Sequence, residues 1–136
     1  GKVEILNYVM AQDSGRILDK EIAEGQLHGG IAHGIGNALF EWMRFDDDGQ
    51  PLTATLAEYL LVTATEIPNL ELILHETPTP RNPLGVKGIG ECGLMPATSA
   101  IVSAIEDALS PFNAHLTRVP LTPPDILAAI AAGSRR

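Results

Sequence analysis

One carboxylate, that of Glu91, lies in a stretch of backbone that is rich in glycine. Residues 82–93 read Asn-Pro-Leu-Gly-Val-Lys-Gly-Ile-Gly-Glu-Cys-Gly. Glycine lets the main chain approach a bulky partner closely, and a general base beside a large cofactor needs a carboxylate held in such a mould. A solvated glutamate on a surface loop is the alternative, and the loop alone does not decide between them.

A second glycine cluster lies upstream, at positions 25, 29, 30, 34 and 36, inside a segment with a helical pattern. Each interior glycine costs a helix roughly 1 kcal/mol relative to alanine. The segment is therefore expected to be a stable helix only if close packing against backbone or a cofactor compensates. Gly25 and Gly29, and likewise Gly30 and Gly34, are four residues apart and form a narrow face that another segment can approach.

In order and content, both clusters resemble the C-terminal end of the molybdopterin-binding subunit of the xanthine dehydrogenase/aldehyde oxidase/carbon monoxide dehydrogenase family of molybdenum hydroxylases. That family has G-Q-x-x-G-(G/A) on a helix and G-x-K-G-x-G-E about sixty residues later. Further matches are Asp13-Ser14-Gly15-Arg16, Glu58-Tyr59-Leu60-Leu61 with Thr63-Ala64, and Thr77-Pro78-Thr79-Pro80. The chain departs from the family at Asp19-Lys20, His28, His33 and Val62.

The resemblance implies roles for residues in both clusters. Glu91 would be the catalytic general base, in a dry pocket. Gln26 would hydrogen bond to the pterin, and the cofactor-binding set would be Gln26, Gly29, Gly30, Lys87, Gly88 and Gly90. For Gln26 the alternative is a buried amide satisfied by backbone. For Lys87, a solvated side chain and one that helps to neutralise an anionic cofactor are equally compatible with the sequence. No protein-ligated metal is expected, because the pterin holds the molybdenum.

The resemblance also implies a function for the complete protein, which would oxidise an aldehyde or N-heterocycle with oxygen derived from water. Its cofactor would be molybdenum–molybdopterin in a dinucleotide form such as molybdopterin cytosine dinucleotide. Expected partners are the rest of the large subunit, iron–sulfur and FAD subunits or domains, and a small-molecule substrate. We expect residues 1–136 to be a fragment, the C-terminal part of the molybdopterin-binding domain. A separately encoded small subunit and a non-catalytic folding or assembly module are the alternatives.

Composition limits the other function classes. The 136 residues carry 9 basic and 17 acidic side chains, a net charge of −8, which argues against nucleic acid and anionic membranes as partners. No apolar run is long enough for a membrane span, and we expect a cytoplasmic protein. In isolation the chain is expected to bind no cofactor, to be inactive and to form oligomers or a partly disordered Glu91 loop.

The residue pattern predicts one α+β unit of short strands and packed helices, part of a larger domain. Strands are expected over residues 3–10, 70–75 and 114–121. Helices are expected over about 22–43 and 96–109, and from Thr122-Pro123-Pro124-Asp125, which has capping-box spacing, to Gly133. Residues 46–51 should form a solvated turn, and residues 56–64 a short helix or irregular buried segment.

Three other readings of the motifs are weaker. Residues 88–93 satisfy G-x-G-x-x-G, but a proline-rich approach and Pro96 separate them from the strand and helix of a dinucleotide site. His28 and His33 point about 140° apart on an ideal helix and do not converge on a metal. Cys92, the single cysteine, is better explained as a small buried residue than as a nucleophile.

Overall fold

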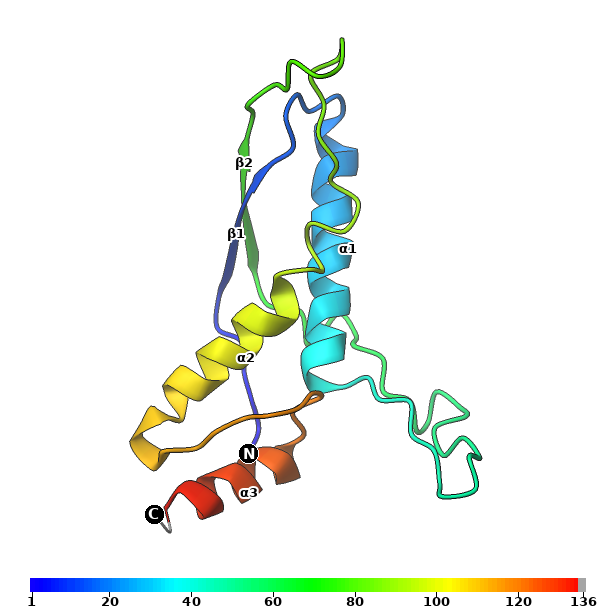
Figure 1. Cartoon of the computed structure of the whole chain (residues 1–136), viewed down its shortest axis with the longest axis vertical. Helices are drawn as coiled ribbons and strands as arrows, with labels where there is room; N and C mark the ends of the chain where they lie inside the picture. The colour runs from blue at the N-terminus through cyan, green and yellow to red at the C-terminus, as the bar shows by residue number, and fades with distance from the viewer. Residues whose placement is uncertain (135–136) are drawn as a thin grey trace.

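A computed structural model describes residues 1–134. It contains two strands and three α-helices, with a short 3₁₀ turn at Ser110–Phe112. The strands and the longest helix run side by side, while the other two helices lie toward the end that carries the chain termini (Figure 1). This arrangement confirms the predicted α+β class.

The sheet consists of two parallel strands, β1 (Tyr8–Asp13) and β2 (Leu70–His75), with Tyr8 opposite Leu70 and Asp13 opposite His75. The bounds predicted for β2 are confirmed. The prediction for β1 was wrong at both ends, because the strand starts later than residue 3 and continues to Asp13. Residues 3–7 cannot extend the ladder, since residues 64–66 form a turn and Pro68 has no N–H to donate.

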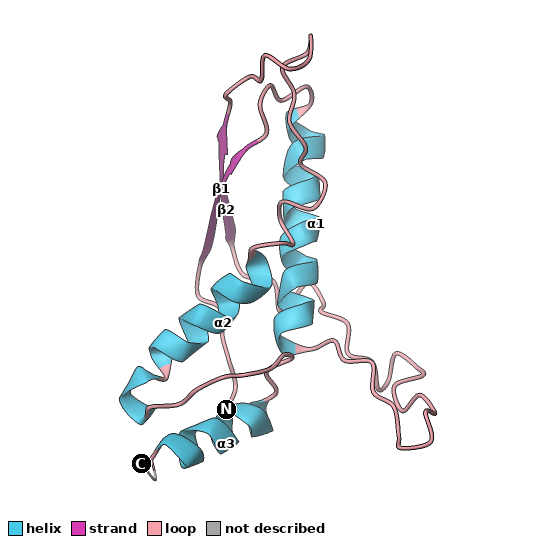
Figure 2. Ribbon diagram, viewed as in Figure 1, coloured by secondary structure: helices cyan, strands magenta, loops and turns pink. Residues whose placement is uncertain are grey.

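Helix α1 (Lys20–Leu39) lies along the sheet (Figure 2). It begins two residues before the predicted start, because the Asp19 carboxylate caps it by accepting the N–H of Ile22 at 3.0 Å. It ends before the predicted residue 43, where the N–H groups of Phe40 and Glu41 both turn back to the Gly36 carbonyl. One stripe of the helix is buried, formed by Ala23, Leu27, Ile31, Ile35 and Ala38.

That stripe explains how a glycine-rich helix is stable. Leu27, Ile31 and Ile35 are fully buried, and each such side chain contributes about 1.5–3 kcal/mol through removal of apolar surface from water. This gain offsets the cost of roughly 1 kcal/mol for each interior glycine. The stability of α1 therefore comes from tertiary packing, as the sequence required.

Helix α2 (Ala97–Ala108) packs against α1 and buries Ala97, Ile101 and Ile105. Helix α3 (Pro123–Gly133) begins at a capping box, in which Thr122 and Asp125 bond to each other's backbone N–H groups. Both predicted helices are confirmed to within one residue at each end. The turn around Asp46 is confirmed as well, with the Asp46 carboxylate accepting N–H bonds from Asp48 and Gln50.

Two predicted elements are wrong. Residues 114–121 form no strand, because their N–H groups bond elsewhere: Leu116 donates to the Glu106 carboxylate at 3.0 Å and Leu121 to the Ala38 carbonyl at 2.7 Å. Residues 56–64 form turns and irregular backbone, without a helix, and are mostly exposed and not buried: Leu56 is 73% exposed, and Val62 is partly buried against the core. They belong to residues 42–66, which project away from the body as an arm (Figure 1).

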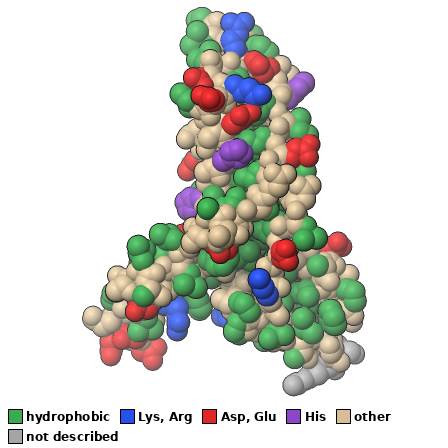
Figure 3. Space-filling view, turned by 180° about the vertical axis from the view of Figure 1, so that it is seen from behind, with side chains coloured by type: hydrophobic (Ala, Val, Ile, Leu, Met, Phe, Trp, Pro, Cys, Tyr) green, Lys and Arg blue, Asp and Glu red, His purple; other side chains and the backbone are tan. Residues whose placement is uncertain are grey.

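The surface is unevenly apolar. In the view from behind, hydrophobic side chains gather over the lower half, and acidic and basic side chains occur both there and along the upper column (Figure 3). An open groove of about 910 Å³ lies between residues 2–12 and the outer face of α2, lined there by Ala100, Ala104 and Ala108. Within residues 1–134, no helix combines the length and apolar character needed to cross a membrane.

Candidate functional site

The two glycine clusters lie against each other. A Cβ atom placed on Gly93 would be 2.6 Å from the Leu27 carbonyl oxygen, and one placed on Gly30 would be 2.8 Å from the Gly93 Cα atom. Real Cβ atoms do not approach backbone this closely, so both positions require glycine. The loop backbone therefore rests directly on the backbone of α1, as predicted for this helix face.

Glu91 lies two residues before this contact, at the start of a tight turn. Its carbonyl accepts N–H bonds from Leu94 at 3.1 Å and Met95 at 3.0 Å, while Cys92 donates to the Ile89 carbonyl at 3.1 Å. The Glu91 side chain is exposed and makes no hydrogen bond or ion pair with the described residues. The expected dry pocket around Glu91 is thus not formed by residues 1–134, and its carboxylate is free to meet a partner from outside them.

The residues predicted to face a cofactor share this openness. On α1, Gln26 is one turn before Gly30 and is exposed, and within residues 1–134 its amide makes no hydrogen bond. It is therefore not the buried, backbone-satisfied amide of the alternative reading. A Cβ atom on Gly29, Gly88 or Gly90 would meet nothing within 4 Å. The contact between Gly93 and Gly30 thus brings the Glu91 turn to the Gln26–Gly30 part of α1, and leaves open space above both.

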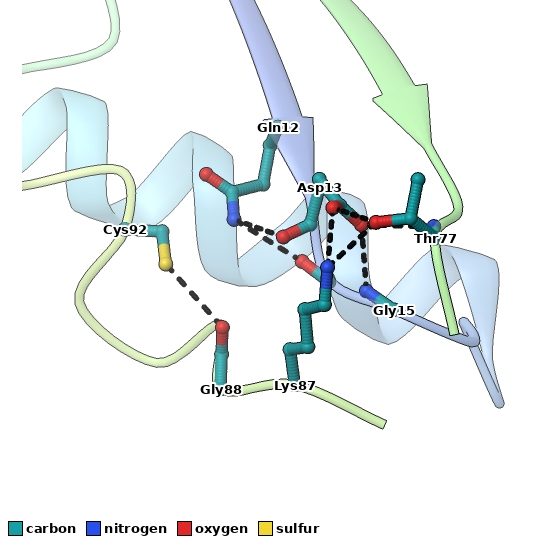
Figure 4. A network of polar contacts seen from close by, with 8 residues as sticks. Gln12, Asp13, Gly15, Thr77, Lys87, Gly88 and Cys92 are labelled. Atoms are coloured by element: carbon teal, nitrogen blue, oxygen red, sulfur yellow. Dashed lines mark hydrogen bonds and ion pairs between the residues drawn. The ribbon is translucent and has the colours of Figure 1, made fainter. Parts of the chain in front are cut away.

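Lys87 has a partner that the sequence did not predict. Its ammonium group lies 2.5 Å from the Asp13 carboxylate and 2.6 Å from the Thr77 hydroxyl (Figure 4). In this chain the side chain is therefore neither simply solvated nor directed at an open site. A backbone hydrogen bond holds the same two segments together, because Lys87 donates its N–H to the Ser14 carbonyl at 2.9 Å.

Asp13 is the centre of this network. One carboxylate oxygen accepts the N–H groups of Gly15 at 2.9 Å and Thr77 at 3.0 Å, and the other accepts the Thr77 hydroxyl and the Lys87 ammonium group. The hydrogen bond from Lys87, followed by those from Thr77 and Gly15, holds the pKa of Asp13 well below its usual range. The carboxylate is therefore ionised, and the pair joins the end of β1 to the start of the Glu91 loop.

Sequence reasoning missed the pairing of Asp13 with Lys87 and Thr77. Two sequence features marked these residues: Asp13 is the first residue of the Asp-Ser-Gly turn, and Thr77 is the first residue of the proline-rich segment before the Glu91 loop. Their convergence was not visible, since the partners are 64 and 74 residues away from Asp13 along the chain.

The remaining candidates stay minor. Cys92 is half-buried and its thiol donates to the Gly88 carbonyl at 3.5 Å. The backbone before residues 88–93 is irregular and not a strand, and α2 starts only at Ala97. The G-x-G-x-x-G segment therefore lacks the strand and helix of a dinucleotide site. In the part of the chain that the structure describes, no group of three His, Cys, Asp or Glu side chains could hold a metal ion.

Comparison with known proteins identifies the family. The molybdopterin cofactor-binding domain family matches residues 1–68, the half of the chain that contains α1 and its glycines. The chain belongs to this family and resembles the large subunits of molybdenum hydroxylases over nearly all of its length. The resemblance inferred from the two glycine clusters is thereby confirmed.

Three similar proteins illustrate the relationship. The chain is 39% identical over 93% of its length to 6-hydroxypseudooxynicotine dehydrogenase complex subunit gamma of Paenarthrobacter nicotinovorans. It is 38% identical over 95% of its length to the nicotine 6-hydroxylase large subunit of the same organism. The crystal structure of quinoline 2-oxidoreductase from Pseudomonas putida 86 superposes with a TM-score of 0.91 at 38% identity over 94% of the chain. The chain spans 16% of the length of each of these three relatives.

Proposed function

We propose that residues 1–136 form the C-terminal part of the cofactor-binding domain of a molybdenum hydroxylase, and that Glu91 is its general base. The complete protein would oxidise an aldehyde or N-heterocycle with oxygen taken from water. The observation that supports this proposal is the contact between Gly93 and Gly30, which holds the turn containing the exposed Glu91 against the glycine-rich helix α1.

The described residues fit one side of a molybdopterin group. Gln26 presents a free planar amide, which has both donors and an acceptor for a pterin ring, and Gly29, Gly88 and Gly90 leave the backbone accessible to a bulky ligand. Gln26, Gly29, Gly88 and Gly90 are the residues that we expect to hold the cofactor, while Gly30, also in the predicted set, is covered by Gly93 and supports the loop. Lys87 contributes positive charge nearby, although its ammonium group is already paired with Asp13.

The chemistry divides between cofactor and protein. When bound, the molybdenum cofactor supplies the two-electron oxidation. The Glu91 carboxylate accepts the proton that water gives up as its oxygen adds to the electron-poor carbon of the substrate. The Gly93 contact holds the Glu91 turn in place, and segments outside residues 1–134 must supply the walls that exclude bulk water, because Glu91 is exposed within them.

The names of the relatives favour one substrate class and one kind of assembly. Nicotine and quinoline are N-heterocycles, so we propose an N-heterocycle before an aldehyde. One relative is a subunit of a complex and another is a large subunit, in keeping with iron–sulfur and FAD partners that carry the electrons away. The cytosine dinucleotide form of the cofactor is part of the proposal and is tested by identifying the nucleotide that acid hydrolysis releases.

The test is Glu91→Gln in the complete enzyme. Loss of a general base should lower turnover by about 10²–10⁴-fold, while molybdenum and pterin content stay at the wild-type level. Glu71→Gln, the same change at an exposed position on β2, is the matched control and should leave turnover unchanged. Turnover of Glu91→Gln within about threefold of wild type would remove Glu91 from the mechanism.

A molybdenum and pterin assay on the complete protein separates this function from the alternative of a non-catalytic assembly module. Stoichiometric cofactor supports the hydroxylase. A protein that folds and assembles with its partners but contains neither molybdenum nor pterin would favour the assembly module.

A further inference from the structure

The Glu91 loop is fixed at both ends. At its far end, Gly93 rests on the backbone of α1. At its near end, the Arg16 N–H donates to the Gly85 carbonyl at 2.9 Å, and Lys87 bonds to the Ser14 carbonyl at 2.9 Å. Between these two anchors, residues 88–92 form a turn closed by the Cys92 N–H on the Ile89 carbonyl, and Ile89 and Cys92 are partly buried against the core.

One side chain, that of Asp13, adds to the backbone hydrogen bonds of the near anchor. Asp13 accepts four hydrogen bonds, which come from three separate segments: the turn after β1, the chain after β2 and the start of the loop. Two groups join all three segments. One is the Gly85 carbonyl, which accepts the N–H groups of Arg16 at 2.9 Å and Thr79 at 3.1 Å, and the other is the Asp13 carboxylate. The ion pair is only partly exposed, with 37% of the Lys87 side chain and 32% of the Asp13 side chain accessible, so solvent weakens it without abolishing it.

We propose that Asp13 is a positioning residue for Glu91. Through Lys87 and Thr77 it fixes the near end of the loop, so that the turn containing Glu91 keeps its position against α1. Lys87 acts as the link between Asp13 and the loop and not as a ligand of the cofactor. This inference rests on the proposed role of Glu91, and it assigns to Lys87 a task different from the one that the family resemblance implied.

Asp13→Asn in the complete protein tests the link with little change of shape. The amide oxygen can still accept the N–H groups of Gly15 and Thr77, whereas the amide nitrogen cannot accept a bond from Lys87. We expect hydrogen exchange of the hydrogen-bonded backbone amides of Arg16, Lys87 and Cys92 to rise about tenfold, the signature of local opening. Turnover should fall about 10- to 100-fold with KM little changed, because a misplaced base slows the chemical step, and molybdenum content should stay at the wild-type level.

Lys87→Met removes the other half of the link and keeps the length of the side chain. It should reproduce both effects, and the double variant should be no worse than either single variant, as for two residues that act as one unit. Asp107→Asn, an exposed change on α2, is the matched control and should alter neither exchange nor turnover.

Three outcomes would overturn the proposal. The first is unchanged exchange of the Arg16, Lys87 and Cys92 amides in both single variants. The second is additive losses in the double variant. The third is loss of molybdenum in Lys87→Met but not in Asp13→Asn, which would make Lys87 a cofactor ligand. If Asp13→Asn does not fold, the exchange and molybdenum measurements on Lys87→Met decide. Hydrogen exchange does not depend on the chemistry of Glu91, so a failed Glu91→Gln test leaves this result interpretable.

Discussion

Helix α1 carries two pairs of glycines with the same spacing and opposite surroundings. Gly30 and Gly34 touch Gly93 and Ala97 so closely that neither could carry a Cβ atom, whereas Gly25 and Gly29 have nothing within 4 Å of that position. The first pair is thus explained by packing within the chain. Gly25 and Gly29 weaken the helix, and no contact with the described residues compensates for that cost. We therefore expect a ligand or a segment from outside these residues to pack there.

The largest expected effect lies at the packed pair. Gly30→Ala would place its Cβ atom 2.8 Å from the Gly93 Cα atom, and backbone cannot move aside as a flexible side chain can. We expect a loss of about 1–3 kcal/mol from overpacking, together with reduced turnover because the Glu91 turn shifts. Thermal unfolding and kinetics of the complete protein measure both, and a variant as stable as wild type would show that this contact is not required.

An effect on stability of similar size, but one that a second substitution can reverse, is expected at Gly34. In Gly34→Ala the new Cβ atom would lie 2.3 Å from the Cβ atom of Ala97, again at a cost of about 1–3 kcal/mol. Because the clash is between two methyl groups, Ala97→Gly in the same protein should restore much of the stability. Absence of any rescue in the double variant would mean that the two helices do not meet in this way.

The smallest effect, and one of opposite sign, is expected at the open pair. Gly29→Ala removes a glycine from a helix interior where space is free, so the unfolding free energy of cofactor-free protein should rise by up to about 1 kcal/mol. If the cofactor lies on this face, the same variant should retain less molybdenum through dialysis than wild type. Full retention would exclude Gly29 from the cofactor site.

The sequence predicted the close approach but not which glycine pair makes it. Both pairs have i, i+4 spacing, and only the position of the partner segment relative to the helix distinguishes them. Helix α2, strand β2 and the capping box of α3 were predictable because hydrophobic period and capping residues are local signals. The strand over residues 114–121 was predicted wrongly because strand formation needs a neighbour, and the nearest acceptors for its N–H groups are the Glu106 carboxylate and the Ala38 carbonyl.

For the site too, the sequence predicted the local features but not the contacts between distant segments. The openness around Glu91, Gln26 and Gly88 agrees with the roles proposed from the motifs, although those roles await the variants described above. The dry pocket expected around Glu91 in the complete enzyme stays a prediction, because the Glu91 side chain is exposed within the described residues and water would have to be excluded by surfaces outside them. The Asp13 network could not be predicted, since it depends on a parallel register that brings Asp13 opposite His75, two residues before Thr77.

The double anchoring of the Glu91 loop has an evolutionary consequence. With Lys87 tied to Asp13 and Gly93 seated on α1, the number of residues between them is set by a fixed span, so one inserted or deleted residue would release one end or turn the carboxylate away. The turn at residues 46–50, at an exposed part of the arm, has no such constraint. Among functional relatives, insertions and deletions should therefore accumulate in the arm and be excluded from residues 88–92.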